Sequence, residues 1–159
     1  MSWFISDNHF NHKNIIKYCN RPFSSVEQMN EHMIQCWNNT VQKDDEVFHL
    51  GDFGLGRRED LVRIFEQLNG NITLIRGNHD RLGTKAFKEI GFKDVFKRLE
   101  LGKFVLSHRP LPLEKLKENQ INLHGHIHNH KTVESSTPQH LNLSCEAINY
   151  TPLWIDVTI

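Results

Sequence analysis

The sequence predicts an α/β fold built from two β-sheets that pack on each other. In the first half of the 159-residue chain, short apolar runs alternate with segments of helical spacing, a pattern typical of a parallel sheet. In the second half, apolar runs follow one another with few helical segments between them, which indicates a second sheet. No repeat or linker interrupts the chain, so we expect residues 1–159 to form a single domain.

Each element of the first half has its own sequence signal. Strands are predicted where short apolar runs end at a polar residue or a glycine, and helices where apolar residues recur every three or four positions. The longest helix is predicted from Met29, Met33 and Trp37, which share one face, with Ser24 or Ser25 as its N-cap. The predicted order is strand 3–6, helix 12–19, helix 24–43, strand 46–50, helix 60–68, strand 72–76 and helix 84–90.

The second half is predicted to be richer in strands. Residues 95–100 and 103–107 are expected to form a hairpin that turns at Gly102, and Pro110 indicates the loop that follows it. The remaining predicted elements are a short helix at 114–118 and strands at 121–124, 139–144 and 153–157.

The composition excludes several classes of protein. Nineteen basic and nineteen acidic residues give zero net charge, which argues against coating nucleic acid or anionic membrane by bulk electrostatics but allows a local basic patch. The chain has no apolar run long enough for a transmembrane helix and no signal-peptide pattern at its N-terminus. Three cysteines without a CxxC pair indicate free thiols in the cytoplasm, and eleven histidines point to metal binding.

Five short polar segments, each after a predicted strand, carry side chains that can bind metal. In open α/β sheets, ligands bind beyond the carboxyl ends of the strands, where these segments are expected to meet. The glycines in these segments let the backbone turn sharply. The segments are Asp7-Asn8-His9, Gly51-Asp52, Gly77-Asn78-His79-Asp80, Ser107-His108 and Gly125-His126-Ile127-His128.

The spacing and number of these side chains indicate two metal ions. Residues 7 and 9 are two positions apart, as are residues 126 and 128, so in an extended chain each pair projects from one face and can grip metal from one side. One catalytic transition-metal ion takes roughly three or four protein ligands, so a larger set suits two ions bridged by Asp52. Paired ions form a clamp for displacement at phosphorus. The candidate ligands are Asp7, His9, Asp52, Asn78, His108, His126 and His128.

Taken singly, these pieces have simpler interpretations. His32 and His49 are interpreted as structural or solvated, and the alternating histidines of 124–130 could alone form an adventitious metal-binding strand. The ordered set of five segments is far more specific than any one of its members.

The ordered motifs resemble the calcineurin-like metallophosphoesterase superfamily, including its small bacterial and phage phosphoesterases. The order Asp-x-His, Gly-Asp, Gly-Asn-His-Asp, His and Gly-His-x-His runs from residue 7 to residue 128, and the tail from Asn142 to Leu153 also resembles small members. The resemblance implies a four-layer α/β/β/α sandwich of two mixed sheets flanked by helices. The chain is short, which leaves little room for a cap domain, so we expect none and an open site.

The resemblance also implies a role for each matching residue. The first ion would be held by Asp7, His9 and His128, and the second by Asn78, His108 and His126, with Asp52 as the bridge. His79 would protonate the leaving oxygen or stabilise phosphoryl charge, and Asp80 would orient His79. Manganese is the expected metal, and iron, zinc, nickel and cobalt are also compatible with these ligands.

Together these features predict a dinuclear-metal-dependent phosphoric ester hydrolase that cleaves phosphodiester or phosphomonoester bonds through a metal-bound hydroxide. The expected partner is a small phosphate-ester substrate, with nucleotides among the candidates; neither a membrane nor strong nucleic-acid binding is expected. Arg109, Arg57 and Arg76 are the predicted phosphate contacts because arginine matches phosphate geometry. The alternatives are a nuclease acting on nucleic-acid ends and, less favoured, a non-catalytic metal-binding scaffold.

Overall fold

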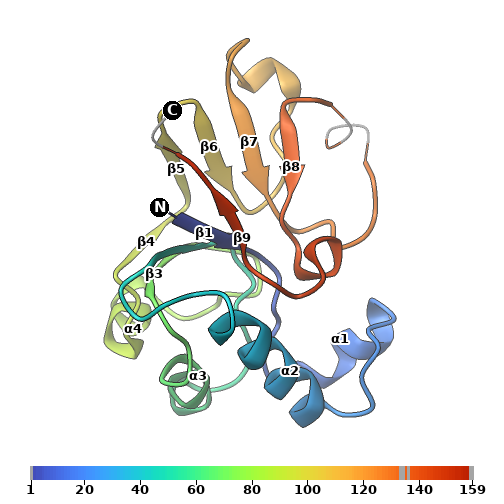
Figure 1. The fold of residues 1–159 in the computed structure, drawn as a ribbon, viewed down its shortest axis with the longest axis vertical. Coiled ribbons are helices and arrows are strands. Elements are labelled where there is room, and N and C mark those ends of the chain that lie inside the picture. Colours follow the sequence, from blue (N-terminus) through green and yellow to red (C-terminus); the bar gives the residue numbers. More distant parts are fainter. Residues whose placement is uncertain (1, 133–134, 136, 158–159) are drawn as a thin grey trace.

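The computed structural model describes residues 2–132, 135 and 137–157, which form two β-sheets packed face to face (Figure 1). The strand order in these residues is β4-β3-β2-β1-β9 in the first sheet and β5-β6-β7-β8 in the second. Strands β1 to β4 are parallel and β9 is antiparallel to β1. Strand β5 is antiparallel to β6, and the other pairs of the second sheet are parallel. The predicted α/β class with two mixed sheets is therefore confirmed.

The elements have the following bounds. The first sheet contains β1 (Ser2–Ile5), β2 (Glu46–His49), β3 (Asn71–Ile75), β4 (Asp94–Phe96) and β9 (Leu153–Ile155). The second sheet contains β5 (Arg98–Leu101), β6 (Phe104–Ser107), β7 (Ile121–His124) and β8 (His140–Asn142). The helices are α1 (Lys13–Tyr18), α2 (Val26–Asn38), α3 (Arg58–Phe65) and α4 (Thr84–Ile90), and η1 (Leu113–Lys115) and η2 (Cys145–Ile148) are short 3-10 turns.

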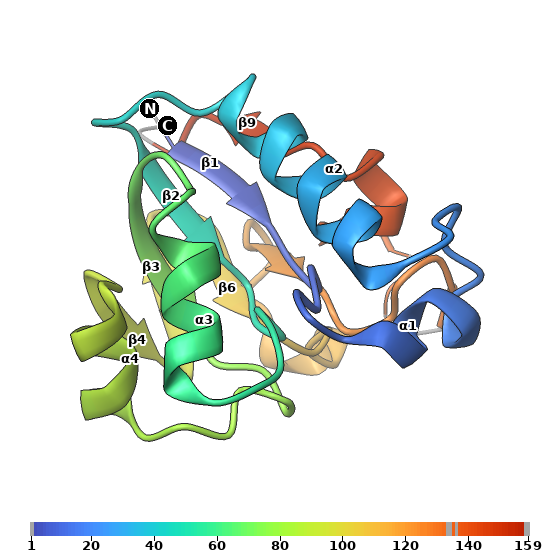
Figure 2. The same cartoon turned by 90° about the horizontal axis from the view of Figure 1, so that it is seen from below.

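Alternate residues of the first sheet face two separate apolar cores. Phe4 of β1 and Ile75 of β3 pack between the sheets against residues such as Leu123 of β7. The neighbouring Ile5 of β1 packs instead in the helix-side core, which contains Trp37 of α2. Figure 2 shows α2 and α3 lying along the face of the first sheet that is turned away from the second sheet. The α-helices thus cover the first sheet, whereas η1 lies between β6 and β7 of the second sheet and η2 lies where the chain returns from β8 to β9.

Two strand predictions were wrong about connectivity. Residues 95–100 were expected to form one arm of a hairpin, but Val95 pairs with Leu74 in the first sheet and Leu99 pairs with Leu106 in the second. The chain therefore crosses between the sheets at Lys97. The strand at residues 153–157 was expected beside the second sheet, but β9 pairs with β1 at the edge of the first. An apolar run in the sequence indicates a strand but does not indicate which sheet that strand joins.

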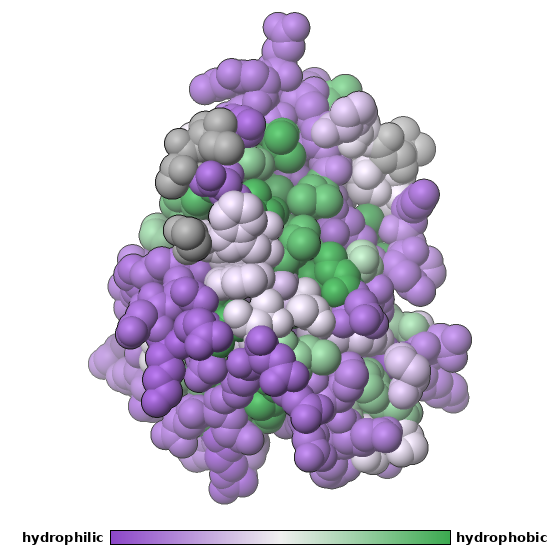
Figure 3. All heavy atoms as spheres, viewed as in Figure 1, coloured by the Kyte–Doolittle hydropathy of each residue, from purple (hydrophilic) through white to green (hydrophobic). Residues whose placement is uncertain are grey.

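Apolar and polar surface are unevenly divided on the face drawn in Figure 3. Hydrophobic residues gather in the upper middle of this face, over the second sheet and β9 and below a hydrophilic tip, and the lower half over the helices is mostly hydrophilic. Large exposed apolar side chains of these strands are Leu141 in β8 and Leu153 and Trp154 in β9. None of the described helices combines the length and apolar character needed to cross a membrane.

Candidate metal centre

The predicted metal-binding segments meet beyond the carboxyl ends of strands from both sheets. The first sheet delivers Asp7 and His9 after β1, Asp52 after β2 and Asn78 after β3; the second delivers His108 after β6 and His126 and His128 after β7. The structure brings these side chains into two adjacent clusters at the seam between the sheets.

The first cluster consists of Asp7, His9 and His128. His9 Nε2 lies 3.9 Å and His128 Nε2 lies 4.0 Å from Asp7 Oδ1. Asp7 Oδ1 and His9 Nε2 are buried and have no hydrogen-bond partner among the described residues, although buried polar atoms are rarely left unpaired. Burial also raises the pKa of the Asp7 carboxyl and lowers that of His9 to about 2, which keeps this imidazole neutral as a ligand must be. A divalent cation at this point would pair both orphan atoms.

The second cluster is centred on His108. Its Nε2 lies 3.0 Å from Asn78 Oδ1, 3.1 Å from His126 Nδ1 and 3.4 Å from Asp52 Oδ2. Imidazole nitrogens, a carboxylate oxygen and an amide oxygen therefore converge, a donor set that suits a divalent transition metal.

Asp52 lies between the two clusters. Its Oδ2 is 3.5 Å from His9 Nε2 and 3.4 Å from His108 Nε2. Its Oδ1 accepts a hydrogen bond from the His79 backbone N–H at 2.8 Å, which fixes the carboxylate. Burial disfavours the charged form, but the hydrogen bond and charge of His108 outweigh burial and hold the Asp52 pKa below its ordinary value. One charged oxygen is thus directed at both clusters, as a bridging ligand requires.

Hydrogen bonds behind two of the histidines fix the orientation of their rings. His108 Nδ1 lies 2.8 Å from the Leu50 carbonyl oxygen, so its N–H donates there and Nε2 faces the second cluster. His128 Nδ1 lies 3.0 Å from Glu146 Oε1, which leaves His128 Nε2 facing the first. Partners of this kind set the tautomer and raise the basicity of a metal-ligating histidine.

Asp7 is held through the oxygen that does not face His9. Asp7 Oδ2 accepts hydrogen bonds from the His126 backbone N–H at 2.8 Å and from Ser144 Oγ at 3.1 Å. The loop after β7 therefore positions a carboxylate that comes from the loop after β1.

Arg21 ties the first cluster to the rest of the fold, and sequence reasoning missed it. The side chain is buried, and its two terminal nitrogens donate to the carbonyl oxygens of Asp7 at 2.6 Å and Asn8 at 2.7 Å. Its Nε donates to Glu146 Oε1 at 2.8 Å. Burial opposes ionisation of Glu146, but His128 and Arg21 together lower its pKa to about 2. The resemblance of the C-terminal tail to small superfamily members could have drawn attention to Glu146. No motif in the sequence points to Arg21.

His49 links two of the loops from within the core. It is fully buried, with Nε2 2.9 Å from Asn8 Oδ1 and Nδ1 accepting the Gly51 N–H at 3.2 Å. Burial lowers its pKa to about 3, so the ring stays neutral. It supports the ligand loops and is not a member of either cluster.

The backbone at the ligands is left-handed rather than extended. Five of the predicted ligands have positive φ: Asp7 59°, His9 51°, Asp52 55°, His126 72° and His128 51°. The expectation that each pair projects from one face of an extended chain was therefore wrong, and residues 126 and 128 go to different clusters. Such conformations typically cost about 1–3 kcal/mol each and concentrate at functional sites.

Gly77 and Gly125 are required because a carboxylate lies too close to leave room for a Cβ, not because the backbone needs a left-handed turn there. A Cβ at Gly77 would overlap Asp52 Oδ1, and a Cβ at Gly125 would overlap Asp7 Oδ2. Only Gly51 among the glycines of these segments has a left-handed φ, at 102°. The backbone at these two glycines is thus in close contact with the carboxylates of Asp52 and Asp7.

His79 and Asp80 occupy different positions around the clusters. The His79 ring centroid lies 5.3 Å from that of His9, and its side chain borders a mainly apolar hollow of about 280 Å³. The Asp80 carboxylate instead accepts three backbone N–H groups, from Asp52 and Gly77 at 2.8 Å and from Phe53 at 3.0 Å. Asp80 therefore holds the Asp52 loop, whereas the family resemblance implied that it orients His79.

The three predicted arginines do not lie together. Arg76 and Arg109 line a groove that also includes Asn78 and His108. Arg57 is 81% exposed at the start of α3, where its Nε lies 3.7 Å from Asp60 Oδ2.

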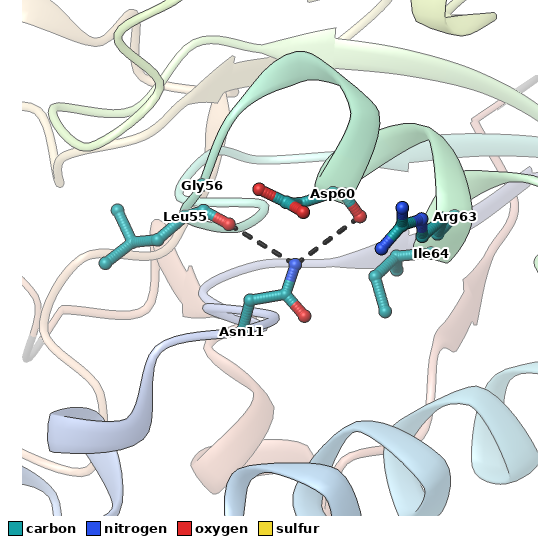
Figure 4. Close-up of a pocket in the computed structure, with 6 residues that line it drawn as sticks. All are labelled: Asn11, Leu55, Gly56, Asp60, Arg63 and Ile64. Atoms are coloured by element: carbon teal, nitrogen blue, oxygen red, sulfur yellow. Dashed lines mark hydrogen bonds between the residues drawn. The ribbon is translucent and has the colours of Figure 1, made fainter.

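A separate hollow of about 570 Å³ lies where the loop after β1 meets α3 (Figure 4). Asn11 Nδ2 donates to the carbonyl oxygens of Leu55 at 3.3 Å and Asp60 at 3.5 Å across its floor. None of the predicted metal ligands lines this hollow. Asn11 instead joins the segment that follows His9 to the segment that follows Asp52.

The family model for the calcineurin-like phosphoesterase superfamily domain matches residues 3–143. The chain belongs to this superfamily. Calcineurin-like phosphoesterases are typically metal-dependent hydrolases of phosphoesters, and the two clusters are candidate sites for the divalent metal.

Three known proteins are similar to this chain in sequence or in fold. An uncharacterized protein of Methanocaldococcus jannaschii is 41% identical over 163 residues, which cover 99% of this calcineurin-like phosphoesterase and 88% of that protein. An Aquifex aeolicus protein of unknown function has the same fold, with a TM-score of 0.74 and 26% identity over 96% of this chain and 94% of that one. The Pseudomonas putida nuclease MPE shares the fold at a TM-score of 0.55 and 22% identity, over 80% of this chain and 61% of the nuclease.

Proposed function

We propose that this calcineurin-like phosphoesterase uses two divalent ions to hydrolyse phosphodiester or phosphomonoester bonds, with diesters preferred. The observation that carries the proposal is Asp52 Oδ2, which lies within 3.5 Å of a histidine nitrogen from each cluster. The unpaired, buried Asp7 Oδ1 and His9 Nε2 support it further. Manganese is the metal we propose, and the three free cysteines fit a cytoplasmic location.

In this proposal, a phosphate ester binds between the metal site and the side chains of Arg109 and His79. Divalent ions in such a site polarise phosphoryl oxygens and lower the pKa of a coordinated water. Arg109 contacts the phosphate oxygens from the groove beside Asn78 and His108. His79, next to His9, donates a proton to the leaving oxygen. Asp80 holds the backbone amides that position Asp52.

A second candidate is a nuclease of the same superfamily. The Pseudomonas putida neighbour is a nuclease by name. The groove beside Asn78 and His108 carries basic side chains, which suit a polyanionic substrate.

The test is a metal-by-substrate screen. Chelator-stripped protein is reloaded with manganese, iron, zinc, nickel or cobalt and assayed with bis-p-nitrophenyl phosphate and p-nitrophenyl phosphate. We expect metal-dependent turnover, with the diester cleaved faster. Absence of turnover of both esters with every metal would overturn the proposal.

Two variants separate metal binding from proton transfer. His79→Ala should lower kcat by roughly 10²–10⁴-fold while metal content stays near that of the wild type. Asp52→Asn should weaken metal binding at both clusters. His130→Ala is the matched control, because His130 is an exposed histidine outside both clusters. Full activity of His79→Ala would remove His79 from the mechanism.

A further inference from the structure

A groove with basic walls begins at the second cluster. It has a volume of about 400 Å³, and two of its lining residues are the candidate ligands Asn78 and His108. Four others are basic: Arg76, Lys97, Arg98 and Arg109. No carboxylate is among its described lining residues. In a chain with zero net charge, such a concentration of cations next to a candidate phosphoesterase centre indicates a site for an anion.

Two of these four cations, Lys97 and Arg98, are available to bind an anion, whereas Arg76 is already engaged within the fold. Arg76 Nε donates to the Asp80 carbonyl oxygen at 3.1 Å, and its guanidinium lies 5.6 Å from the centre of the Phe87 ring. Lys97 has no carboxylate within 4.0 Å among the described residues. Arg98 pairs with Glu100 at 3.2 Å, but both side chains are exposed, and exposed pairs contribute little and exchange readily.

The fold itself gives Lys97 and Arg98 this position. They lie where the chain passes from β4 in the first sheet to β5 in the second. Strand β5 pairs with β6, whose end leads into His108, so the crossover lies beside the second cluster. The crossing between sheets therefore presents two successive basic residues to the groove.

We propose that this groove binds a second phosphate of the substrate, next to the phosphate that is cleaved, with Lys97 and Arg98 as its main contacts. The inference rests on the proposed function, in which the cleaved phosphate lies at the paired clusters and is met by Arg109. A substrate with one phosphate leaves Lys97 and Arg98 without an anion. The second phosphate belongs either to a nucleic-acid strand or to a dinucleotide joined by a pyrophosphate; both offer the same chemistry to the groove.

The kinetic test compares substrates that carry one or several phosphates. Lys97→Ala/Arg98→Ala is assayed with bis-p-nitrophenyl phosphate, a single-stranded tetranucleotide and a pyrophosphate-linked dinucleoside. The ratio of kcat/KM for the substrate with several phosphates to kcat/KM for bis-p-nitrophenyl phosphate should fall at least tenfold. Lys43→Ala, which removes an exposed lysine outside the groove, should leave the ratio unchanged. A fall for the tetranucleotide identifies a strand, and a fall for the dinucleoside alone identifies a pyrophosphate.

A binding test keeps the inference separate from catalysis. Fluorescence anisotropy with labelled tetranucleotide and labelled dinucleoside, on chelator-treated protein, should show affinity at least tenfold weaker in the double variant than in the wild type and in Lys43→Ala. The dependence of log affinity on log salt should also become shallower, by about 0.7 for each lost phosphate contact on a single strand. If affinity and kinetic ratio both match the wild type, the groove assignment is overturned even when the wild type hydrolyses bis-p-nitrophenyl phosphate. If the wild type hydrolyses no ester with any metal, the proposed function fails, and the binding test alone decides the groove.

Discussion

Breaking the buried pair of Arg21 and Glu146 should reduce both stability and metal affinity. Arg21 Nε and one terminal nitrogen each lie 2.8 Å from Glu146 Oε1, and the two side chains are 0% and 6% exposed. Removing one partner of a buried pair costs about 3–5 kcal/mol because the other charge stays buried without compensation. At about 2–4 °C per kcal/mol for a domain of this size, Glu146→Met should lower Tm by roughly 6–20 °C.

A double-mutant cycle tests whether the pair acts as a unit. Replacing both residues by methionine removes both buried charges, so the double variant should be at least ~1 kcal/mol more stable than the sum of the single effects implies. Manganese affinity should fall about 10–100-fold in Glu146→Met and in the double variant, because His128 Nδ1 loses its acceptor. The matched control is the exposed pair of Lys93 and Glu46, for which the coupling should stay below about 1 kcal/mol.

Urea unfolding of chelator-treated protein measures the stability terms, and competition with a chromogenic chelator measures the metal affinity. Additivity within about 0.5 kcal/mol would show that Arg21 and Glu146 do not act together. Wild-type manganese affinity in Glu146→Met would show that Glu146 does not position His128.

Three further predictions concern single residues. Folding lowers the pKa of His49 from 6.5 to about 3, so between these pH values the unfolded chain binds a proton that the folded chain does not. As the pH is lowered from 6.5 to 3, the free energy of unfolding should therefore fall by up to about 1.4 kcal/mol per pH unit. His49→Gln should flatten this dependence of the free energy on pH, measured by urea unfolding. An unchanged slope would refute this. Gly125→Ala should lower the metal content, measured by elemental analysis, because the added Cβ would overlap the Asp7 carboxylate. Gly83→Ala is the control, because its Cβ would face open space and should leave the metal content unchanged. Equal metal content in the two variants would contradict the close approach of Gly125 to Asp7. Asp80→Asn replaces one acceptor oxygen with an amide donor that faces backbone N–H groups. The free energy of unfolding in urea should therefore fall by about 1–3 kcal/mol. An unchanged free energy of unfolding would show that these hydrogen bonds are unimportant.

Local patterns predicted much of the fold. The helix at Thr84–Ile90 and the strand at Ile121–His124 have the predicted bounds, because apolar spacing and flanking glycines are local signals. The assignment of residues 95–100 to one strand failed because periodicity carries no information about which sheet a strand joins. The same limit applies to β9, whose partner β1 lies at the opposite end of the chain.

The candidate site was predictable in its residue types and less so in its geometry. The candidate ligands follow from which side chains can bind metal and from the order of the motifs. The left-handed backbone at Asp7 and Asp52 was not visible, because these conformations are imposed by neighbouring loops rather than by local preference. Arg21 and Glu146 are 125 residues apart, so only the folded chain reveals their contact.

The most direct test of the paired clusters is anomalous diffraction from crystals grown with manganese. Two anomalous peaks should lie roughly 3.5–4 Å apart, one on each side of Asp52 Oδ2, the first contacting Asp7, His9 and His128. Cys19, His128 and Glu146 form another group whose ligand atoms lie within 4.8 Å of one another. A single peak, or manganese bound only by this group, would contradict a bridged two-ion centre.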